Sequence, residues 1–233
     1  MKILALDTAT ELCSAALWLD GSCLTREDAR PRASGELILG MIAELLAESA
    51  LTLARLDAIA FGRGPGGFTG VRLATAVAQG LGFAADLPLL PISDLRALAQ
   101  RAFSQPDSPP RALICQDARM RQVYWGCFEC NTGAPRCTRT ATAAGAEAVA
   151  NPEAVMLPSA WMDGAVCGAG SGFDAYPGLR SRPDLPLMAV WGAFRPRALE
   201  IAALAAADGL SQAVSPEAAQ PVYLRDEVAA PPS

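Results

Sequence analysis

Short apolar runs alternate with longer helix-like segments along the chain, and this alternation predicts an α/β fold. The strands expected in the first part are residues 2–6, 14–19, 22–26, 57–61 and, more weakly because of two prolines, 87–92. The helices expected there are residues 36–50, 69–86 and 94–103, the last capped by Ser93. Asp20-Gly21 predicts a two-residue hairpin turn, and the charged segment 27–34 predicts a loop.

A Pro- and Ser-rich linker at residues 104–110 precedes a second series of elements that partly repeats the first. This series is expected to contain strands at residues 111–116, 122–130, 135–140 and 165–168, a turn at 131–133, a helical turn at 145–150, a helix at 197–207 and an extended tail at 220–225. Each series begins with three strands, and the first strand of each ends at an aspartate, Asp7 or Asp117. The chain therefore reads as a duplicated α/β unit.

This plan is that of the actin-like (ASKHA, ribonuclease H-like) folds, in which two subdomains carry mixed sheets flanked by helices. The subdomains expected are residues 1–104 and 105–233, and the helix at 197–207 is able to pack back on the first of them. ATPases of this plan place glycine after each aspartate so that backbone amides approach phosphate. Here the turns are DTAT and DAR, in which every position carries a Cβ. We expect a vestigial nucleotide site at Asp7, Thr8, Asp117 and Arg119.

The densest pattern lies between the fourth strand and the second helix. Its glycines can adopt positive φ, while the φ of its proline is fixed, so the pattern predicts a loop of defined conformation. The residues of this loop are Gly62, Gly64, Pro65, Gly66, Gly67, Phe68, Thr69 and Gly70. Small residues then recur every fourth position in two rows, Gly70, Ala74, Ala78 and Gly82, and Ala76, Gly80 and Ala84. Such rows let another helix approach closely. The helix at 36–50 carries a wide apolar surface, so both helices are expected to contact a partner.

Composition supports a full core and limits the possible partners. The chain has 233 residues, 52% of them hydrophobic, with a net charge of −5 and a pI near 4.8. An acidic chain lacks the basic footprint expected of an independent nucleic-acid binder. With no secretory signal pattern and no apolar run of membrane length, a cytoplasmic protein is expected.

The absence of histidine excludes several kinds of chemistry. Ser-His-Asp and Cys-His nucleophiles need it, and a Ser-Lys pair has only Lys2 to draw on. The seven cysteines include one CxxC motif, at Cys127 and Cys130. A zinc site usually needs four ligands, and the chain has no histidine to complete such a set. Packed or half-exposed reduced thiols are expected, with no metal site and no cofactor.

Two alternatives follow from the same residues. Gly62-x-Gly64-x-x-Gly67 matches the dinucleotide fingerprint and is followed by Asp94, but three strands precede it, whereas the fingerprint normally follows the first strand of its domain. A working kinase or ATPase of the actin-like fold would use Asp7 and Asp117.

Residues 62–72, GRGPGGFTGVR, closely resemble the GxGPGSFTGLR signature of the bacterial TsaB (YeaZ) family. Residues 3–10 (ILALDTAT), the DAR and VYW segments at 117–125 and the PVYLR tail at 221–225 are similar to other segments of that family. Gly67 and Ala74 replace the usual Ser and Gly, and residues 34–36 (SGE) replace a His-Ser-Glu.

The resemblance implies an actin-like scaffold protein, not an enzyme, that takes part in tRNA threonylcarbamoyladenosine biosynthesis. Members pair with TsaD, the catalytic subunit, and TsaE, an ATPase, joins that assembly to modify adenosine 37 of tRNA. The implied partners are a TsaD-like subunit, a TsaE-like ATPase and, in isolation, a second copy of the chain, with tRNA reached only indirectly. The interface residues expected are Leu37, Met41, Leu45, Arg72, Ala74, Ala78 and Gly82. Ala78→Leu is expected to leave the fold intact and to prevent pairing.

Overall fold

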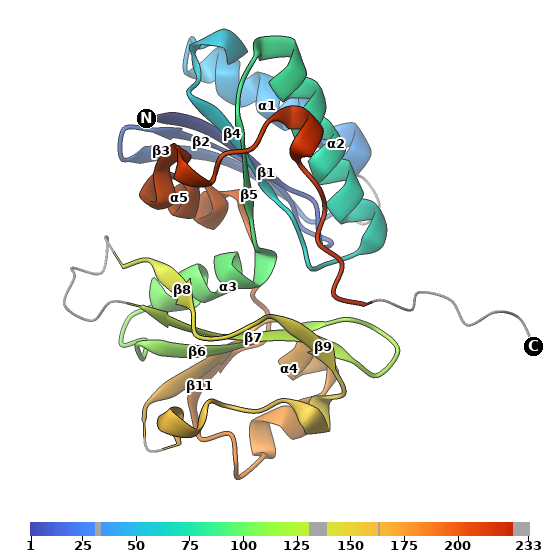
Figure 1. The fold of residues 1–233 in the computed structure, drawn as a ribbon, viewed down its shortest axis with the longest axis vertical. Helices are drawn as coiled ribbons and strands as arrows, with labels where there is room; N and C mark the ends of the chain where they lie inside the picture. Colours follow the sequence, from blue (N-terminus) through green and yellow to red (C-terminus); the bar gives the residue numbers. More distant parts are fainter. Residues whose placement is uncertain (31–33, 131–138, 163, 226–233) are drawn as a thin grey trace, which may run out of the picture.

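Two lobes stacked on one another make up the chain in the computed structural model, which describes residues 1–30, 34–130, 139–162 and 164–225 (Figure 1). The first lobe contains a five-stranded mixed sheet, in the order β3-β2-β1-β4-β5. Its strands are β1 (Lys2–Asp7), β2 (Cys13–Leu19), β3 (Ser22–Asp28), β4 (Ala58–Gly62) and β5 (Leu89–Ile92). The turn between β2 and β3 has φ of 48° at Asp20 and 106° at Gly21, which are the positive values that a tight hairpin turn requires.

Helices cover both faces of this sheet. Helices α1 (Ser34–Glu48) and α2 (Phe68–Ala85) lie on one face, and α5 (Ala198–Asp208) lies on the other. Because side chains of a strand alternate between the faces, Leu4 and Leu6 of β1 pack towards α1 and α2, while Ile3 and Ala5 pack towards α5. This double coverage explains why β1 is apolar from Ile3 to Leu6 and β4 is apolar along its whole length.

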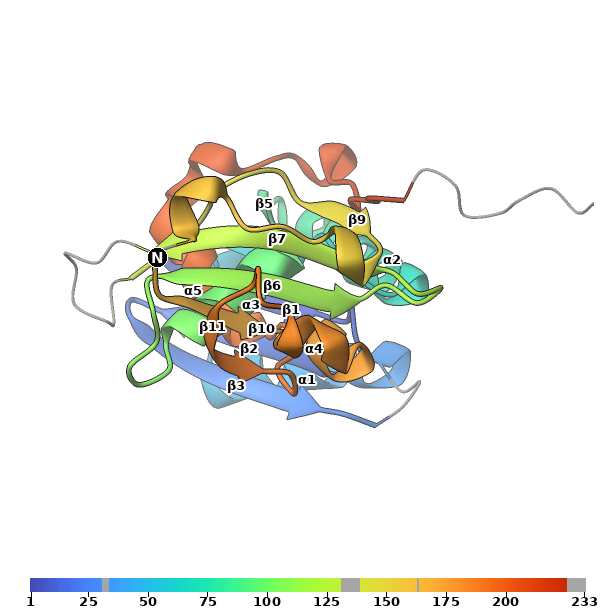
Figure 2. The ribbon, with the colours of Figure 1, turned by 90° about the horizontal axis from the view of Figure 1, so that it is seen from below.

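The second lobe repeats the strand order of the first (Figure 2). Its strands are β6 (Arg111–Asp117), β7 (Val123–Cys130), β8 (Ala141–Ala143), β9 (Ala148–Ala150), β10 (Val166–Ala169) and β11 (Leu187–Trp191), in the order β11-β10-β6-β7-β8 with β9 paired to β7. In the first sheet β1 pairs antiparallel with β2 and parallel with β4, and in the second sheet β6 pairs in the same way with β7 and β10. The duplicated actin-like α/β fold predicted from the sequence is therefore confirmed.

The two lobes exchange a helix. Helix α3 (Asp94–Phe103) follows the strands of the first lobe but packs on β6, β7, β8 and β10, and α5 follows the strands of the second lobe but packs on β1, β2 and β4. The two helices also contact one another, and one apolar cluster runs from β1 through α5 and α3 to β6. The shared core fixes how the strand ends of the two sheets face each other.

Several element predictions differ from the structure. Strand β3 extends to Asp28, so the loop begins later than residue 27. Residues 148–150 form β9 and not a helical turn, because they pair with β7. Strand β11 and the short helix α4 (Gly172–Ala175) were not predicted. The predicted turn at 131–133 and most of the predicted strand at 135–140 lie outside the described residues, and residues 139–140 are not strand.

Candidate functional site

The glycine segment between β4 and α2 packs directly on the turn that follows β1. The amide of Gly67 donates to the Ala9 carbonyl at 2.7 Å, and the Thr8 hydroxyl donates to the Gly70 carbonyl at 2.6 Å. A Cβ at Gly70 would lie 1.9 Å from the Thr8 carbonyl oxygen, and one at Gly66 would lie 2.7 Å from that of Ala9. Glycine is needed here because two backbones touch without any side chain between them.

Each lobe closes its first strand with the same local arrangement. The Asp7 carboxylate accepts a hydrogen bond from the Ala9 amide at 2.9 Å, and the Asp117 carboxylate accepts one from the Arg119 amide at 2.9 Å. Asp117 also accepts from the Tyr176 hydroxyl at 3.2 Å. The amides that follow each aspartate therefore bond within the chain, where an ATPase of this fold would direct them to phosphate.

Two buried carboxyl groups meet beside Gly62. Asp7 and Asp94 are both fully buried, and a Cβ at Gly62 would lie 2.6 Å from Asp7 Oδ1 and 2.4 Å from Asp94 Oδ1. Asp94 Oδ2 accepts from the Gly64 amide at 2.5 Å. Asp7 Oδ2 and Asp94 Oδ1 have no hydrogen-bond partner among the described residues.

Burial dominates the titration of this pair. It raises the pKa of Asp7 to about 6, against the lowering effect of the Ala9 amide. Burial, and then the neighbouring charge of Asp7, raise the pKa of Asp94 well above its ordinary value. Two carboxylates this close are not both ionised near neutral pH, so the pair retains a proton. Sequence reasoning considered Asp94 only as part of a dinucleotide fingerprint and missed this contact, because it joins residues 87 positions apart.

The turn of the second lobe exposes its charge. The Arg119 side chain is 88% exposed and forms an ion pair of 3.1 Å with Asp117. Arg119, Met120 and Arg121 all have positive φ, at 60°, 52° and 59°. Of the residues predicted for a vestigial nucleotide site, Asp7 and Thr8 are thus buried, while Arg119 extends into solvent.

Most of the predicted interface side chains lie inside the chain, which corrects that prediction. They pack with the sheet in one apolar cluster or are buried beside it; they are Met41, Leu45, Ala74, Ala78 and Gly82. Leu37 is half-buried beside the cluster, and Arg72 is exposed. The small-residue row through Ala74 and Ala78 serves the approach of α2 to its own sheet, since Ala74 and Ala78 have no exposed surface. Ala78→Leu is accordingly expected to overpack the core and not to leave the fold intact.

The other small-residue row remains on the surface of α2. Ala76, Gly80 and Ala84 are exposed, and they continue the row that begins at Arg72. Phe83, beside this row, is 58% exposed, and Leu39 of α1 is 55% exposed. The free faces of α1 and α2 therefore combine small and large apolar residues on one side of the first lobe.

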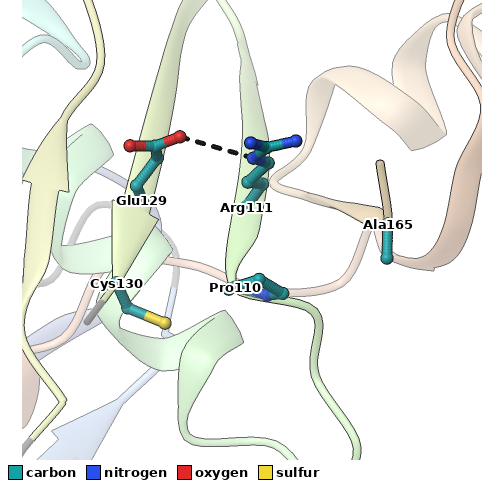
Figure 3. A pocket seen from close by; sticks show the side chains of 5 residues that line it. All are labelled: Pro110, Arg111, Glu129, Cys130 and Ala165. Carbon is teal, nitrogen blue, oxygen red and sulfur yellow. Dashed lines mark ion pairs between the residues drawn. The ribbon is translucent and has the colours of Figure 1, made fainter. Parts of the chain in front are cut away.

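The pocket drawn in Figure 3 lies elsewhere, with a volume of about 260 Å³. It is lined by Pro110, Arg111, Glu129, Cys130 and Ala165, and Arg111 and Glu129 form an ion pair of 3.4 Å across neighbouring strands. Arg111 begins β6 whereas Asp117 ends it, so this pocket is at the far end of the strand from the Asp117 turn. It contains none of the residues predicted for a site.

The described residues hold no cluster of three or more His, Cys, Asp or Glu side chains that could bind a metal ion. The described cysteines are free thiols on strands, five buried and Cys23 half-buried, while Cys137 lies outside the described residues. Among the helices that the structure describes, none is long and apolar enough to cross a membrane.

Comparison with known proteins identifies the family of this chain. It is 39% identical to the tRNA threonylcarbamoyladenosine biosynthesis protein TsaB of Escherichia coli (strain K12) over 233 aligned residues, which cover 98% of this chain and 96% of the relative. The chain belongs to the TsaB family. A family model described as TsaD, tRNA N6-adenosine threonylcarbamoyltransferase, matches residues 29–176, so the chain also belongs to the wider family that this model represents.

Other TsaB relatives and solved structures agree. A TsaB protein of Haemophilus influenzae is 49% identical over 125 residues, or 54% of this chain and 52% of the relative. The solved structure of YeaZ from Pseudomonas aeruginosa superposes with a TM-score of 0.86 at 42% identity, covering 96% of this chain and 99% of that one. A second structure from that organism, of an uncharacterized protein similar to the peptidase YEAZ, superposes with a TM-score of 0.87 at 41% identity and the same coverage.

Proposed function

We propose that this TsaB-family chain is a non-catalytic subunit in the biosynthesis of tRNA threonylcarbamoyladenosine, at adenosine 37. It supports a TsaD-like catalytic subunit, and a TsaE-like ATPase joins that assembly, in the cytoplasm. The observation that carries the proposal is the packing of the glycine segment on the Asp7 turn. Gly66, Gly67 and Gly70 contact Thr8 and Ala9, the turn on which an actin-like ATPase would bind phosphate.

The burial of Asp7 supports the same conclusion. A kinase or ATPase needs the carboxylate at the end of β1 to be accessible to hydrated Mg²⁺. Here Asp7 is fully buried and lies beside a second buried carboxyl group, Asp94. Titration calorimetry of the isolated chain with Mg-ATP is expected to give no micromolar binding. Micromolar binding with turnover that Asp7→Asn abolishes would instead establish the alternative, a nucleotide-dependent kinase or ATPase.

The experiment that tests the proposal is reconstitution. TsaD-like and TsaE-like subunits from the same organism are incubated with threonylcarbamoyl-adenylate and tRNA, with and without this chain, and the modified nucleoside is measured by mass spectrometry. Modification is expected only when the chain is present. Equal modification without it would contradict the proposal.

The exposed row of α2, with the free face of α1, is proposed as the surface that receives the TsaD-like subunit, and a second copy in its absence. Its small residues permit close helix approach, and Phe83 and Leu39 supply apolar area. The charge of −5 is consistent with tRNA being reached through the partner.

Ala76→Trp tests this surface. Because Ala76 is exposed, the variant is expected to keep its melting temperature within about 2 °C, while the bulky ring weakens partner affinity at least about tenfold. Ala207→Trp is the matched control, since Ala207 is an exposed helix position on α5, on the opposite face of the sheet. Calorimetry with the TsaD-like subunit gives the affinities, and equal affinity for both variants would place the interface elsewhere.

A further inference from the structure

Residues 221–225, here called the C-terminal strap, connect the two lobes (Figure 1). At one end the Val222 amide donates to the Arg63 carbonyl at 2.7 Å, directly after β4. At the other end Arg225 Nη2 donates to the Ala118 carbonyl at 3.1 Å and to Gln122 Oε1 at 2.6 Å, in the turn between β6 and β7. The strap therefore joins the glycine segment of the first lobe to the Asp117 turn of the second.

The strap is closely fitted to the glycine segment. A Cβ at Gly64 would lie 2.8 Å from the Val222 carbonyl oxygen, and Gly64 has a φ of 99°. Further back along the chain, the Gln79 side chain of α2 donates to the carbonyls of Pro216 and Ala219, both at 3.1 Å. The segment leading to the strap is thus held along α2.

Between its two anchors the strap fixes the side chain of Arg72. The Arg72 Nε–H donates to the Tyr223 hydroxyl at 2.7 Å. The guanidinium carbon lies 3.7 Å from the centre of the Phe68 ring, and the Phe68 and Tyr223 rings are 5.9 Å apart. An exposed arginine ordinarily samples many rotamers, and these contacts select one of them.

Arg72 remains available for binding in this arrangement. It is exposed, and no described Asp or Glu forms an ion pair with it. With Nε bound to Tyr223, the two terminal nitrogens form a planar pair of the kind that binds a carboxylate through two hydrogen bonds. Phe68 and Tyr223 are 49% and 44% exposed, so the guanidinium has aromatic surface beside it for a partner to cover.

We propose that Tyr223 and Arg225 are positioning residues for partner docking: the strap holds Arg72 in the rotamer that binds an acidic side chain of the partner. The inference rests on the proposed function, since it takes the partner to be the TsaD-like subunit. Tyr223 acts on Arg72 directly. Arg225 acts through the strap, by fixing its far end to the second lobe.

A double-mutant cycle on the full chain tests the role of Tyr223. Affinity for the TsaD-like subunit is measured without tRNA. Arg72→Ala is expected to weaken it about tenfold and Tyr223→Phe about three- to tenfold, because the ring is kept and only the hydroxyl is lost. The double variant is expected to be no weaker than Arg72→Ala, since Tyr223 acts only through Arg72. Arg55→Ala is the control for loss of an exposed charge and is expected to leave affinity unchanged.

Rescue by a conservative residue tests Arg225. Arg225→Ala is expected to weaken binding about threefold, and Arg225→Lys to recover most of it, because one donor still reaches the Ala118 carbonyl. Additive losses in the Arg72–Tyr223 cycle, or wild-type affinity for Tyr223→Phe, would overturn the inference while leaving the proposed function intact.

Absence of any complex with the wild-type chain would instead count against the proposed function. The strap is then tested alone, by the exchange rate of the Arg72 Nε–H in NMR spectra of the free chain. Exchange is expected to be faster in both Tyr223→Phe and Arg225→Ala than in the wild type. Unchanged exchange in both variants would overturn the positioning role.

Discussion

Gly70→Ala is expected to lower the free energy of unfolding by about 3–5 kcal/mol. The added methyl would lie 1.9 Å from the Thr8 carbonyl oxygen and 3.2 Å from the Ala9 Cα. Both are backbone atoms in the buried turn that follows β1. A change of side-chain rotamer therefore cannot relieve the clash, and the first turn of α2 must move instead. Urea unfolding followed by circular dichroism measures the loss.

Gly80→Ala in the same helix is the matched control. A Cβ at Gly80 would meet nothing within 4 Å, and the position is exposed. Alanine is therefore expected to stabilise the chain by about 0.5–1 kcal/mol through helix propensity alone. If both variants changed stability by less than 1 kcal/mol, the close packing of the glycine segment on the Asp7 turn would be wrong.

Asp94→Asn is expected to raise stability at pH 7 by about 2–3 kcal/mol and to flatten its dependence on pH. The folded chain holds a proton on the Asp7–Asp94 pair that the unfolded chain releases above a pKa of about 4. Stability from this pair is therefore greatest below about pH 4 and is lost as pH rises, first through the folded pKa of Asp7, about 6, and further as Asp94, whose pKa is also raised, gives up its proton. The asparagine oxygen still accepts from the Gly64 amide, and its amide donates to Asp7, so the pair no longer needs the proton.

Chemical unfolding between pH 5 and pH 8 measures this difference. The wild type is expected to lose stability over this range and Asp94→Asn to lose much less. Asp86→Asn is the control, because Asp86 is exposed and caps α2 with a φ of 53°, a conformation that asparagine tolerates. It is expected to follow the wild type within about 0.5 kcal/mol at each pH. A wild-type curve that rises steadily from pH 5 to pH 8 would show that the pair carries no shared proton.

Local pattern was enough to predict most of the elements and the duplication. The signals used were apolar runs, the Asp20-Gly21 turn and the Ser93 cap, each of which depends on only a few neighbouring residues. The structure has β1, β2, β4, α2 and α3 at the positions that these signals predicted. Predictions were wrong where pairing with a distant strand decided the conformation. Residues 148–150 are strand because β7 lies beside them, and nothing local indicates it.

The candidate site shows the same division. The glycines at 62–70 predicted that this segment lies close to another part of the backbone. Their resemblance to a family motif indicated the family from the sequence alone. Periodicity also revealed two small-residue rows on α2, at Ala74 and Ala78 and at Ala76 and Gly80. Periodicity does not say which row faces the sheet, because both repeat every four residues, and the row predicted to meet a partner, Ala74 and Ala78, is the one that packs on the sheet of its own lobe.

The amino-acid sequence by itself determined the α/β class, the duplicated plan, the glycine segment and the absence of histidine chemistry, since each depends on residue identity and short-range spacing. Only the tertiary structure decided which face of α2 is free, that Asp7 and Asp94 share one buried space, and that Tyr223 holds Arg72. The last two join positions 87 and 151 residues apart, and contacts of that kind arise only when the chain closes its core around α3 and α5.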